Sequence, residues 1–236
     1  MNLKKIGLTL MLAAAFQFFA IGQQFSQVVA GFSGKKLASI TLENGTVMKA
    51  YIKNAKFKKG LIKELILKDE KGKKMNLSPE DIKFMYAPPS GLGKLASAMD
   101  FATDAQNWGD DGMENDLLKD GFVYYEKSEV MVKKKKITAL LQLVNPSFGK
   151  KIRVYNDPWA GETASVGVAG IKVAGGNEKS YYVKNGDEVA YRIKKKEYSK
   201  QYKKLYNNCK AVSKKYPKVK WDDFAKHIAE FTTECK

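Results

Sequence analysis

Apolar and polar positions alternate with a period of two through residues 36–87, which is the pattern of β-strands with one buried face. Residues 40–42 and 47–52 flank the dipeptide Asn44-Gly45. This dipeptide predicts a hairpin with a type I′ turn, because both central positions of that turn need a positive φ. Residues 36–52 are therefore expected to form the first hairpin.

The same pattern continues to residue 87. Residues 62–67 and 74–77 predict a second hairpin, and Ser78 is expected to cap a tight turn that begins at Pro79. Residues 82–86 then predict a fifth strand. We expect a small curled sheet or barrel at residues 36–87, preceded by a lead-in at 23–35.

The next two regions differ in pattern. Tandem prolines end the first unit, and residues 88–120 predict a linker with a short amphipathic helix that begins at Leu92 and ends near Trp108, followed by acidic residues. Residues 121–194 return to strand patterns, at 122–125, 129–132, 137–144, 152–155, 166–173, 180–183 and 189–193. Most connections are too short for helical crossovers, so we expect a larger antiparallel sheet with the order of a meander.

From Lys195 the period becomes helical. Tyr198, Tyr202, Leu205 and Cys209 share one face, and residues 221–235 repeat an aromatic stripe that ends in Cys235. We expect a C-terminal helical cap at residues 195–236. The predicted fold class is α+β and rich in β-structure.

The first residues have the order of a secretory signal peptide. Lys4 and Lys5 precede an apolar run over 6–21, and small and polar residues follow at Gly22 and Gln23. We expect residues 1–22 to be a signal peptide cleaved at the Gly22/Gln23 junction, with an uncleaved anchor as the alternative. Export would place the protein in the periplasm, at the outer membrane or outside the cell.

Export changes the interpretation of the two cysteines, because oxidising compartments favour disulfides. Cys209 and Cys235 are expected to form one bridge, with two buried thiols as the alternative. In a simple helical hairpin Cys235 would lie about 20 Å along the return helix from Cys209, whereas bridged Cα atoms lie within about 7 Å. The bridge therefore requires the first helix to break near Asn207-Asn208, two poor helix formers.

The chain carries 42 Lys and Arg against 25 Asp and Glu, a formal charge of +17. Only Arg153 and Arg192 are arginines, and arginine makes the bidentate contacts to phosphates and guanine. Dispersed lysines do not indicate specific nucleic-acid recognition. They leave open adhesion to an anionic glycan or lipid surface, or binding to an envelope protein.

Few residues offer catalytic or metal chemistry. His227 is the only histidine, lies on a helix with an aromatic stripe and is expected to be a partly buried structural residue, so zinc is not predicted. Asp110, Asp111 and Glu114 are weak calcium candidates, because carboxylates around a glycine suit a hard cation. The ligand alternation of an EF-hand fails there, and a solvated acidic loop is favoured. We predict no catalytic residue and no cofactor.

Two tyrosine pairs, Tyr124-Tyr125 and Tyr181-Tyr182, raise the question of a carbohydrate-stacking platform. Adjacent strand residues face opposite ways, so one tyrosine of each pair is expected in the core and the other on the surface. Packing is favoured over a sugar site.

Several of these segments resemble an uncharacterised family of exported proteins typical of Bacteroidota. The resemblance rests on the strand-turn-strand unit at 40–52, on residues 77–82 and 179–183, and on the late tyrosine-rich helix with Cys209 and Cys235. Ala50 departs from the pattern, where glycine is expected. The motifs are structural, and the resemblance implies no reaction. The function expected is a non-catalytic binding or scaffold protein of the envelope, with a carboxylate-based hydrolase such as a glycosidase as the alternative.

Overall fold

The computed structural model describes residues 23–29, 31–90, 113–160, 166–168, 171–174 and 177–235, with only the backbone path at 166–168 and 171–174. The predicted signal peptide at 1–22, with the Gly22 side of its cleavage junction, lies outside these residues. So do the helix predicted from Leu92 to near Trp108 and the calcium candidates Asp110 and Asp111.

The prediction of five strands in the first unit is confirmed. They are β1 (Leu37–Leu42), β2 (Val47–Lys58), β3 (Leu61–Lys68), β4 (Lys74–Leu77) and β5 (Ile82–Ala87). All pair in antiparallel fashion in the order β4-β3-β2-β1-β5. Their buried apolar face forms a core that includes Ile40, Leu65 and Ile82.

The turns of this unit differ from the predicted ones. At the first hairpin only Gly45 has a positive φ (84°), and its N–H donates to the Leu42 carbonyl at 2.9 Å. This is a type I turn followed by a left-handed glycine, so the type I′ prediction for Asn44-Gly45 is wrong. Lys59 and Gly60, between β2 and β3, both have a positive φ (51° and 76°) and form the two-residue type I′ loop instead.

The tight turn before β5 is the 3-10 helix η2 (Pro79–Asp81). Ser78 is its N-cap, as expected, and Asp81 at the third helical position completes a capping box. The Asp81 carboxylate accepts hydrogen bonds from the N–H and the hydroxyl of Ser78, both at 2.7 Å. These bonds hold the pKa of Asp81 below its usual range.

The strands of the second region continue the same sheet. After α3 (Asn115–Lys119), they are β6 (Val123–Val132), β7 (Lys135–Gln142), β8 (Ile152–Asn156), β11 (Ser180–Asn185) and β12 (Ala190–Lys194). β5 pairs with β6, so one 10-stranded sheet joins the two regions. The segment predicted as one strand at 166–173 is a separate hairpin of β9 (Val166–Val168) and β10 (Ile171–Ala174).

The expected meander order is wrong at β6. One edge of β6 pairs with β5 as far as Glu126 and then with β12, in parallel, at Val130 and Met131. Beyond Glu126, β5 no longer pairs with this edge of β6, so the edge is open for pairing with β12. A strand separated in sequence by sixty residues can thus enter beside β6.

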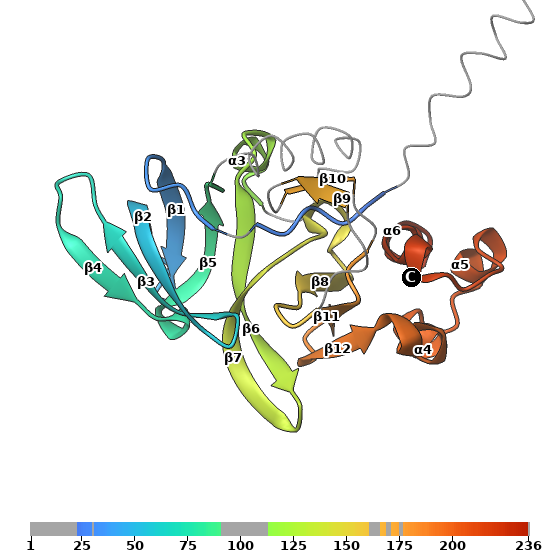
Figure 1. Cartoon of the computed structure of the whole chain (residues 1–236). Coiled ribbons are helices and arrows are strands. Elements are labelled where there is room, and N and C mark those ends of the chain that lie inside the picture. Colours follow the sequence, from blue (N-terminus) through green and yellow to red (C-terminus); the bar gives the residue numbers. More distant parts are fainter. Residues whose placement is uncertain are drawn as a thin grey trace, which may run out of the picture.

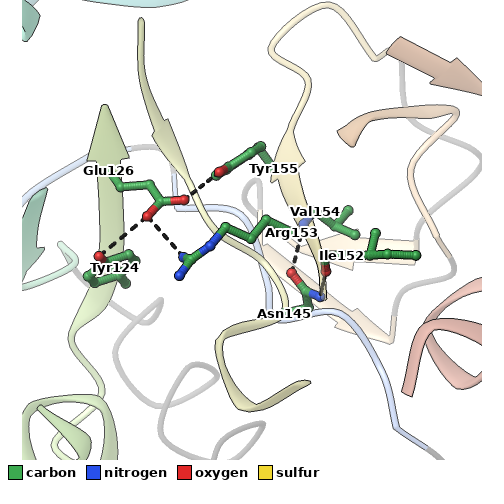
Figure 2. Close-up of polar contacts among 7 residues, drawn as sticks. All are labelled: Tyr124, Glu126, Asn145, Ile152, Arg153, Val154 and Tyr155. Carbon is green, nitrogen blue, oxygen red and sulfur yellow. Dashed lines mark hydrogen bonds and ion pairs between the residues drawn. The ribbon is translucent and has the colours of Figure 1, made fainter. Parts of the chain in front are cut away.

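β6, β7, β8, β11 and β12 form a closed strand ring. The end of β7 reaches β8 through the Leu143–Tyr155 bridge and the bond from the Val144 N–H to the Val154 carbonyl, at 2.8 Å. Asn145 fixes the corner between β7 and β8. It is the residue before the 3-10 helix η4 (Pro146–Phe148). Its amide donates to the Ile152 carbonyl and its oxygen accepts from the Val154 N–H, both at 2.8 Å (Figure 2).

The helical cap covers one side of this ring (Figure 1). It consists of η5 (Lys195–Glu197), α4 (Tyr198–Leu205), α5 (Lys210–Lys215), η6 (Trp221–Asp223) and α6 (Phe224–Glu234). Asn207 and Asn208 both have a positive φ (43° and 55°), which ends α4. The predicted helix break and the Cys209–Cys235 disulfide, with Cα atoms 6.1 Å apart, are confirmed. Over the described part of the chain, no helix is long and apolar enough to cross a membrane.

The lead-in crosses both regions, as the blue trace in Figure 1 shows. The Ser26 N–H donates to the Val144 carbonyl at 2.7 Å, and the Val29 N–H donates to the side chain of Gln142 at 3.1 Å. Phe25 packs against Phe224 of the cap. The lead-in is therefore part of the core and ties the sheet to the helices.

Candidate ligand-binding groove

A groove of ≈ 1480 Å³ opens where the β2–β3 hairpin, the β6–β7 hairpin, η2 and β12 come together. Figure 1 shows the β6–β7 hairpin extending from the sheet, and β3 contacts β7. Eight basic residues line it: Lys58, Lys59 and Lys63 from the first hairpin, Lys133, Lys134 and Lys135 from the second, and Arg192 and Lys194 from β12. We refer to it as the lysine groove.

The seven lysines of the groove have no ion pair with a carboxylate among the described residues, although Glu80 and Glu197 also line the groove. Neighbouring lysines on the same hairpins are paired: Lys56 with Glu64 at 2.7 Å, and Lys136 with Glu129 at 2.8 Å. Positive charge is therefore compensated beside the groove and left uncompensated along it. Such a distribution attracts anions.

The floor of the lysine groove is apolar and aromatic. Leu61 and Ile62 of β3, Val132 of β6 and Ile137 of β7 contribute aliphatic surface. Trp159, Tyr182 and Tyr191 contribute rings. Among the described lining residues, Thr138 is the one neutral hydrogen-bonding side chain besides the two tyrosines and the tryptophan. The groove thus combines a cationic rim with a surface that favours apolar contact.

An ion pair orders the aromatic end of the floor. Asp157 is fully buried; its carboxylate contacts Arg192 Nε at 2.7 Å and accepts hydrogen bonds from Arg192 Nη2 at 3.0 Å and Ser180 at 2.6 Å. The guanidinium of Arg192 lies 5.6 Å from the ring centre of Trp159 and 5.7 Å from that of Tyr182, which is the geometry of cation–π contacts. Burial raises the pKa of Tyr182.

The β2–β3 turn is held against the segment that carries Trp159. A Cβ added at Gly60 would lie 2.7 Å from the Pro158 Cβ, and Gly60 also has a φ of 76°. Both features require glycine. The turn therefore approaches Pro158 closely and fixes the position of Lys59 at the rim.

A second polar cluster lies on the strands beside the groove and outside its lining (Figure 2). The carboxylate of Glu126 accepts a hydrogen bond from Arg153 Nη1 at 2.9 Å, a short one from the Tyr155 hydroxyl and a long one from Tyr124 at 3.4 Å. Burial raises the pKa of both tyrosines. Each arginine of the chain thus pairs with a largely buried carboxylate, which indicates a structural role for both pairs.

Of the three calcium candidates, Glu114 alone lies among the described residues. Glu114 precedes α3, and its N–H donates to the Tyr86 hydroxyl at 2.6 Å. Asp110 and Asp111 lie outside the described residues. Within the described ranges, no group of three or more His, Cys, Asp or Glu side chains could hold a metal ion.

His227 is fully buried in the cap, more so than expected. Its Nδ1 lies 2.6 Å from the Tyr198 hydroxyl, which is also 2.8 Å from the Tyr206 hydroxyl. Burial lowers the pKa of His227 to about 4. The residue is therefore neutral at pH 7 and belongs to a closed aromatic network.

The expectation of one exposed tyrosine in each pair is wrong. Tyr124, Tyr125, Tyr181 and Tyr182 are all buried, with at most 7% of each residue exposed. The sheet is covered on both faces at these positions, so that Tyr181 packs toward the helical cap and Tyr182 toward the opposite face. The burial of all four rings agrees with packing, which the sequence favoured over a sugar-stacking platform.

Residues 133–136 are four consecutive lysines, but nothing in the sequence pattern connects them with the lysines at 58, 59 and 63. The shared signal is that both clusters lie at hairpin turns with a left-handed residue, at Lys59 and Lys133. No local pattern indicates that these two turns face one groove with Trp159 and Arg192.

Comparisons of this chain with family models, curated proteins and solved structures find no match.

Proposed function

We propose that this protein is an exported, non-catalytic binding protein of the cell envelope that takes up an anionic ligand in the lysine groove. One observation carries the proposal: seven lysines without ion pairs to described residues surround a single groove, while lysines beside it are paired. Folding gains nothing from concentrating like charges, so their placement favours a role in binding.

Export is part of the proposal. The order of residues 1–22 supports it, and the Cys209–Cys235 disulfide gives weak additional support because such bridges are rare in a reducing cytoplasm. The protein is expected to act in the periplasm, at the outer membrane or outside the cell.

Binding is favoured over a carboxylate-based hydrolase. Such an enzyme needs one carboxyl group free to give a proton and a second to attack or to activate water. The best-ordered carboxylates, Glu126 and Asp157, are each held by an arginine. Of the described groove residues, Glu80 on η2 and Glu197 on η5 are acidic, against eight that are basic.

The test compares charge reversal in the groove with the same reversal elsewhere. Lys58→Glu/Lys134→Glu changes two exposed groove lysines, and Lys49→Glu/Lys71→Glu changes two exposed lysines outside the groove lining. Binding to immobilised heparin and to dodecyl phosphate is measured at low and high salt. The groove variant is expected to bind at least about thirtyfold more weakly, because each of its two lysines contributes about 1 kcal/mol toward an anionic partner.

The control variant has the same net charge and is expected to keep most of the wild-type affinity. Equal losses in the two variants would show that net charge, and not the groove, attracts the anion. If the wild-type protein binds neither heparin nor dodecyl phosphate at low salt, the proposal is wrong.

A further inference from the structure

The chemistry of the groove floor narrows the ligand class. We infer that the occupant is a single-chain anionic amphiphile, with its acidic head among the rim lysines and its alkyl chain along the floor. This inference rests on the proposed function, because it assumes that the lysine groove is the binding site. It adds to that function the requirement that the ligand carry an alkyl chain, which the positive charge of the rim alone does not imply.

The floor is poorly suited to an anionic glycan. A sugar presents hydroxyl groups that need hydrogen-bond partners once they leave water. Leu61, Ile62 and Ile137 offer none. The neutral hydrogen-bonding groups of the described lining are the Thr138 hydroxyl, the hydroxyls of the two tyrosines and the indole N–H of the tryptophan. A sulfated or carboxylated oligosaccharide could pair with the rim, but it would place its hydroxyl groups on aliphatic side chains.

An alkyl chain fits the same surface without this penalty. Ile62 and Tyr182 are already buried by neighbouring strands, whereas Met131 is 36% exposed and Leu61, Val132 and Ile137 are half-buried or nearly so. These partly exposed side chains would lose contact with water when a chain lies on them. The groove volume of ≈ 1480 Å³ exceeds the roughly 300–1,000 Å³ typical of compact small-molecule pockets, and it leaves room for an extended chain.

The acidic head belongs at the lysines and not at Arg192. Asp157 already contacts Nε and Nη2 of that guanidinium, so the net charge at the pair is close to zero. Lys58, Lys63 and Lys134 have no such partner in the described structure. Arg192 is a positioning residue: its stacking on Trp159 and Tyr182 keeps the aromatic end of the floor in place.

The experiment varies head and chain separately, using soluble monomers below their micelle concentration and isothermal calorimetry. Butyl, octyl and dodecyl phosphate share a head, while dodecyl trimethylammonium and dodecyl maltoside share the longest chain. A heparin tetrasaccharide supplies anionic charge without a chain. Affinity is expected to rise about three- to fourfold per added methylene until the floor is filled, and the cationic amphiphile is expected not to bind.

A variant of the floor gives a second readout. Met131→Gln removes apolar surface at an exposed position of the groove, and Val47→Gln makes the same kind of change at a residue that is 59% exposed and outside the lining. We expect Met131→Gln to weaken dodecyl phosphate binding about threefold or more and to leave tetrasaccharide binding unchanged. Val47→Gln should change neither.

The outcomes separate this inference from the proposed function. If butyl phosphate or the tetrasaccharide binds as tightly as dodecyl phosphate, the amphiphile inference is overturned and anion binding stands. If phosphatidylglycerol vesicles bind but monomeric dodecyl phosphate does not, the groove adheres to surfaces and the inference also fails. If no anionic probe binds, both proposals fail together.

Discussion

The helical cap and the lysine groove lie on the same sheet and are built in opposite ways. In the cap, Tyr198, Phe224 and His227 pack ring against ring, and the Cys209–Cys235 bridge closes the chain around them. In the groove, apolar side chains stay partly exposed and lysines lack ion pairs to described residues. The cap buries its aromatic rings even though the Tyr202 hydroxyl and His227 Nε2 have no hydrogen-bond partner in the described structure, whereas the groove leaves charge and apolar surface exposed to solvent.

This contrast separates stability from binding. Large side chains buried in the cap contribute the greater part of their transfer free energy to folding. Groove side chains that remain in water contribute little until a ligand covers them. Changes in the cap should therefore alter the free energy of unfolding and leave anion binding intact, and groove changes should do the reverse.

The largest expected effect comes from removing the disulfide. Cys209→Ser/Cys235→Ser opens a loop with a sequence separation of 26, and the chain-entropy model gives a loss of about 3.5 kcal/mol in unfolding free energy. Urea denaturation measures this loss. Dodecyl phosphate affinity under native conditions should equal that of the wild type, and a parallel loss of affinity would contradict the separation of the two regions.

Acid should weaken the cap through His227. Burial lowers the pKa of His227 to about 4, below the value of about 6.5 in an unfolded chain, so only the unfolded state takes up the proton between these limits. The free energy of unfolding should therefore decrease as the pH falls from about 6.5 to about 4, by at most about 3 kcal/mol. Urea denaturation at several pH values checks this.

His227→Gln provides the control, because it removes the titrating group and should flatten this slope even if it lowers stability overall. A hydrogen bond from Lys226 lowers the pKa of nearby Asp223, so stability from that pair is present above about pH 4 and lost below it. Its contribution falls outside the histidine window. An unchanged slope in His227→Gln would assign the pH dependence to other groups.

Gly60→Ala should have an intermediate effect that reaches both regions of the sheet. The new Cβ would have to displace Pro158 and adopt a φ of 76°, which together should cost about 2 kcal/mol and shift the groove rim. Gly45→Ala is the matched control, since Gly45 has a φ of 84° and nothing within 4 Å of the added Cβ. It should cost about 1 kcal/mol and leave binding unchanged.

Thermal denaturation and dodecyl phosphate binding of the two glycine variants provide the measurement. The difference between them isolates the contact with Pro158 from the backbone cost. Equal binding by both variants would show that the position of the β2–β3 turn does not matter to the groove.

The smallest effects on stability are expected when a groove lysine and a lysine in an ion pair are each replaced by glutamine. Lys63→Gln should leave the unfolding free energy within about 0.5 kcal/mol of wild type and weaken anion binding severalfold. Lys56→Gln breaks an exposed ion pair with Glu64, should also cost no more than about 0.5 kcal/mol, and should not affect binding. Identical binding by the two variants would remove the distinction between paired and unpaired lysines.

Local patterns predicted the elements well where neighbours in sequence decide the outcome. The five strands of the first unit follow from spacing and residue type. The disulfide was expected from export, and the bridge in turn required the break at Asn207-Asn208. The type I′ turn was assigned to Asn44-Gly45 and occurs at Lys59-Gly60, because the pairing of Lys58 with Leu61 leaves exactly two residues for the second loop. Turn type depends on strand register, which the dipeptide alone does not determine.

Contacts between distant segments were beyond the sequence patterns. The parallel entry of β12 beside β6 brings Arg192 to the groove, where Asp157 meets it across 35 residues of chain. Both faces of the sheet are covered at Tyr124 and Tyr182, which alternation along a single strand could not reveal. These features depend on which strands become neighbours.

By itself, the sequence determined which segments have the hydrophobic period of a strand or of a helix, how far lysine exceeds the acidic residues, and that one disulfide is possible. These properties depend on residue type and on spacing over a few turns. Only the tertiary structure decided that two lysine-rich turns face one apolar floor, and that both arginines form ion pairs with largely buried carboxylates. The physical reason is that ion pairing and burial act through space. A lysine acquires its role from which carboxylates or apolar surfaces the fold places within a few ångströms of it.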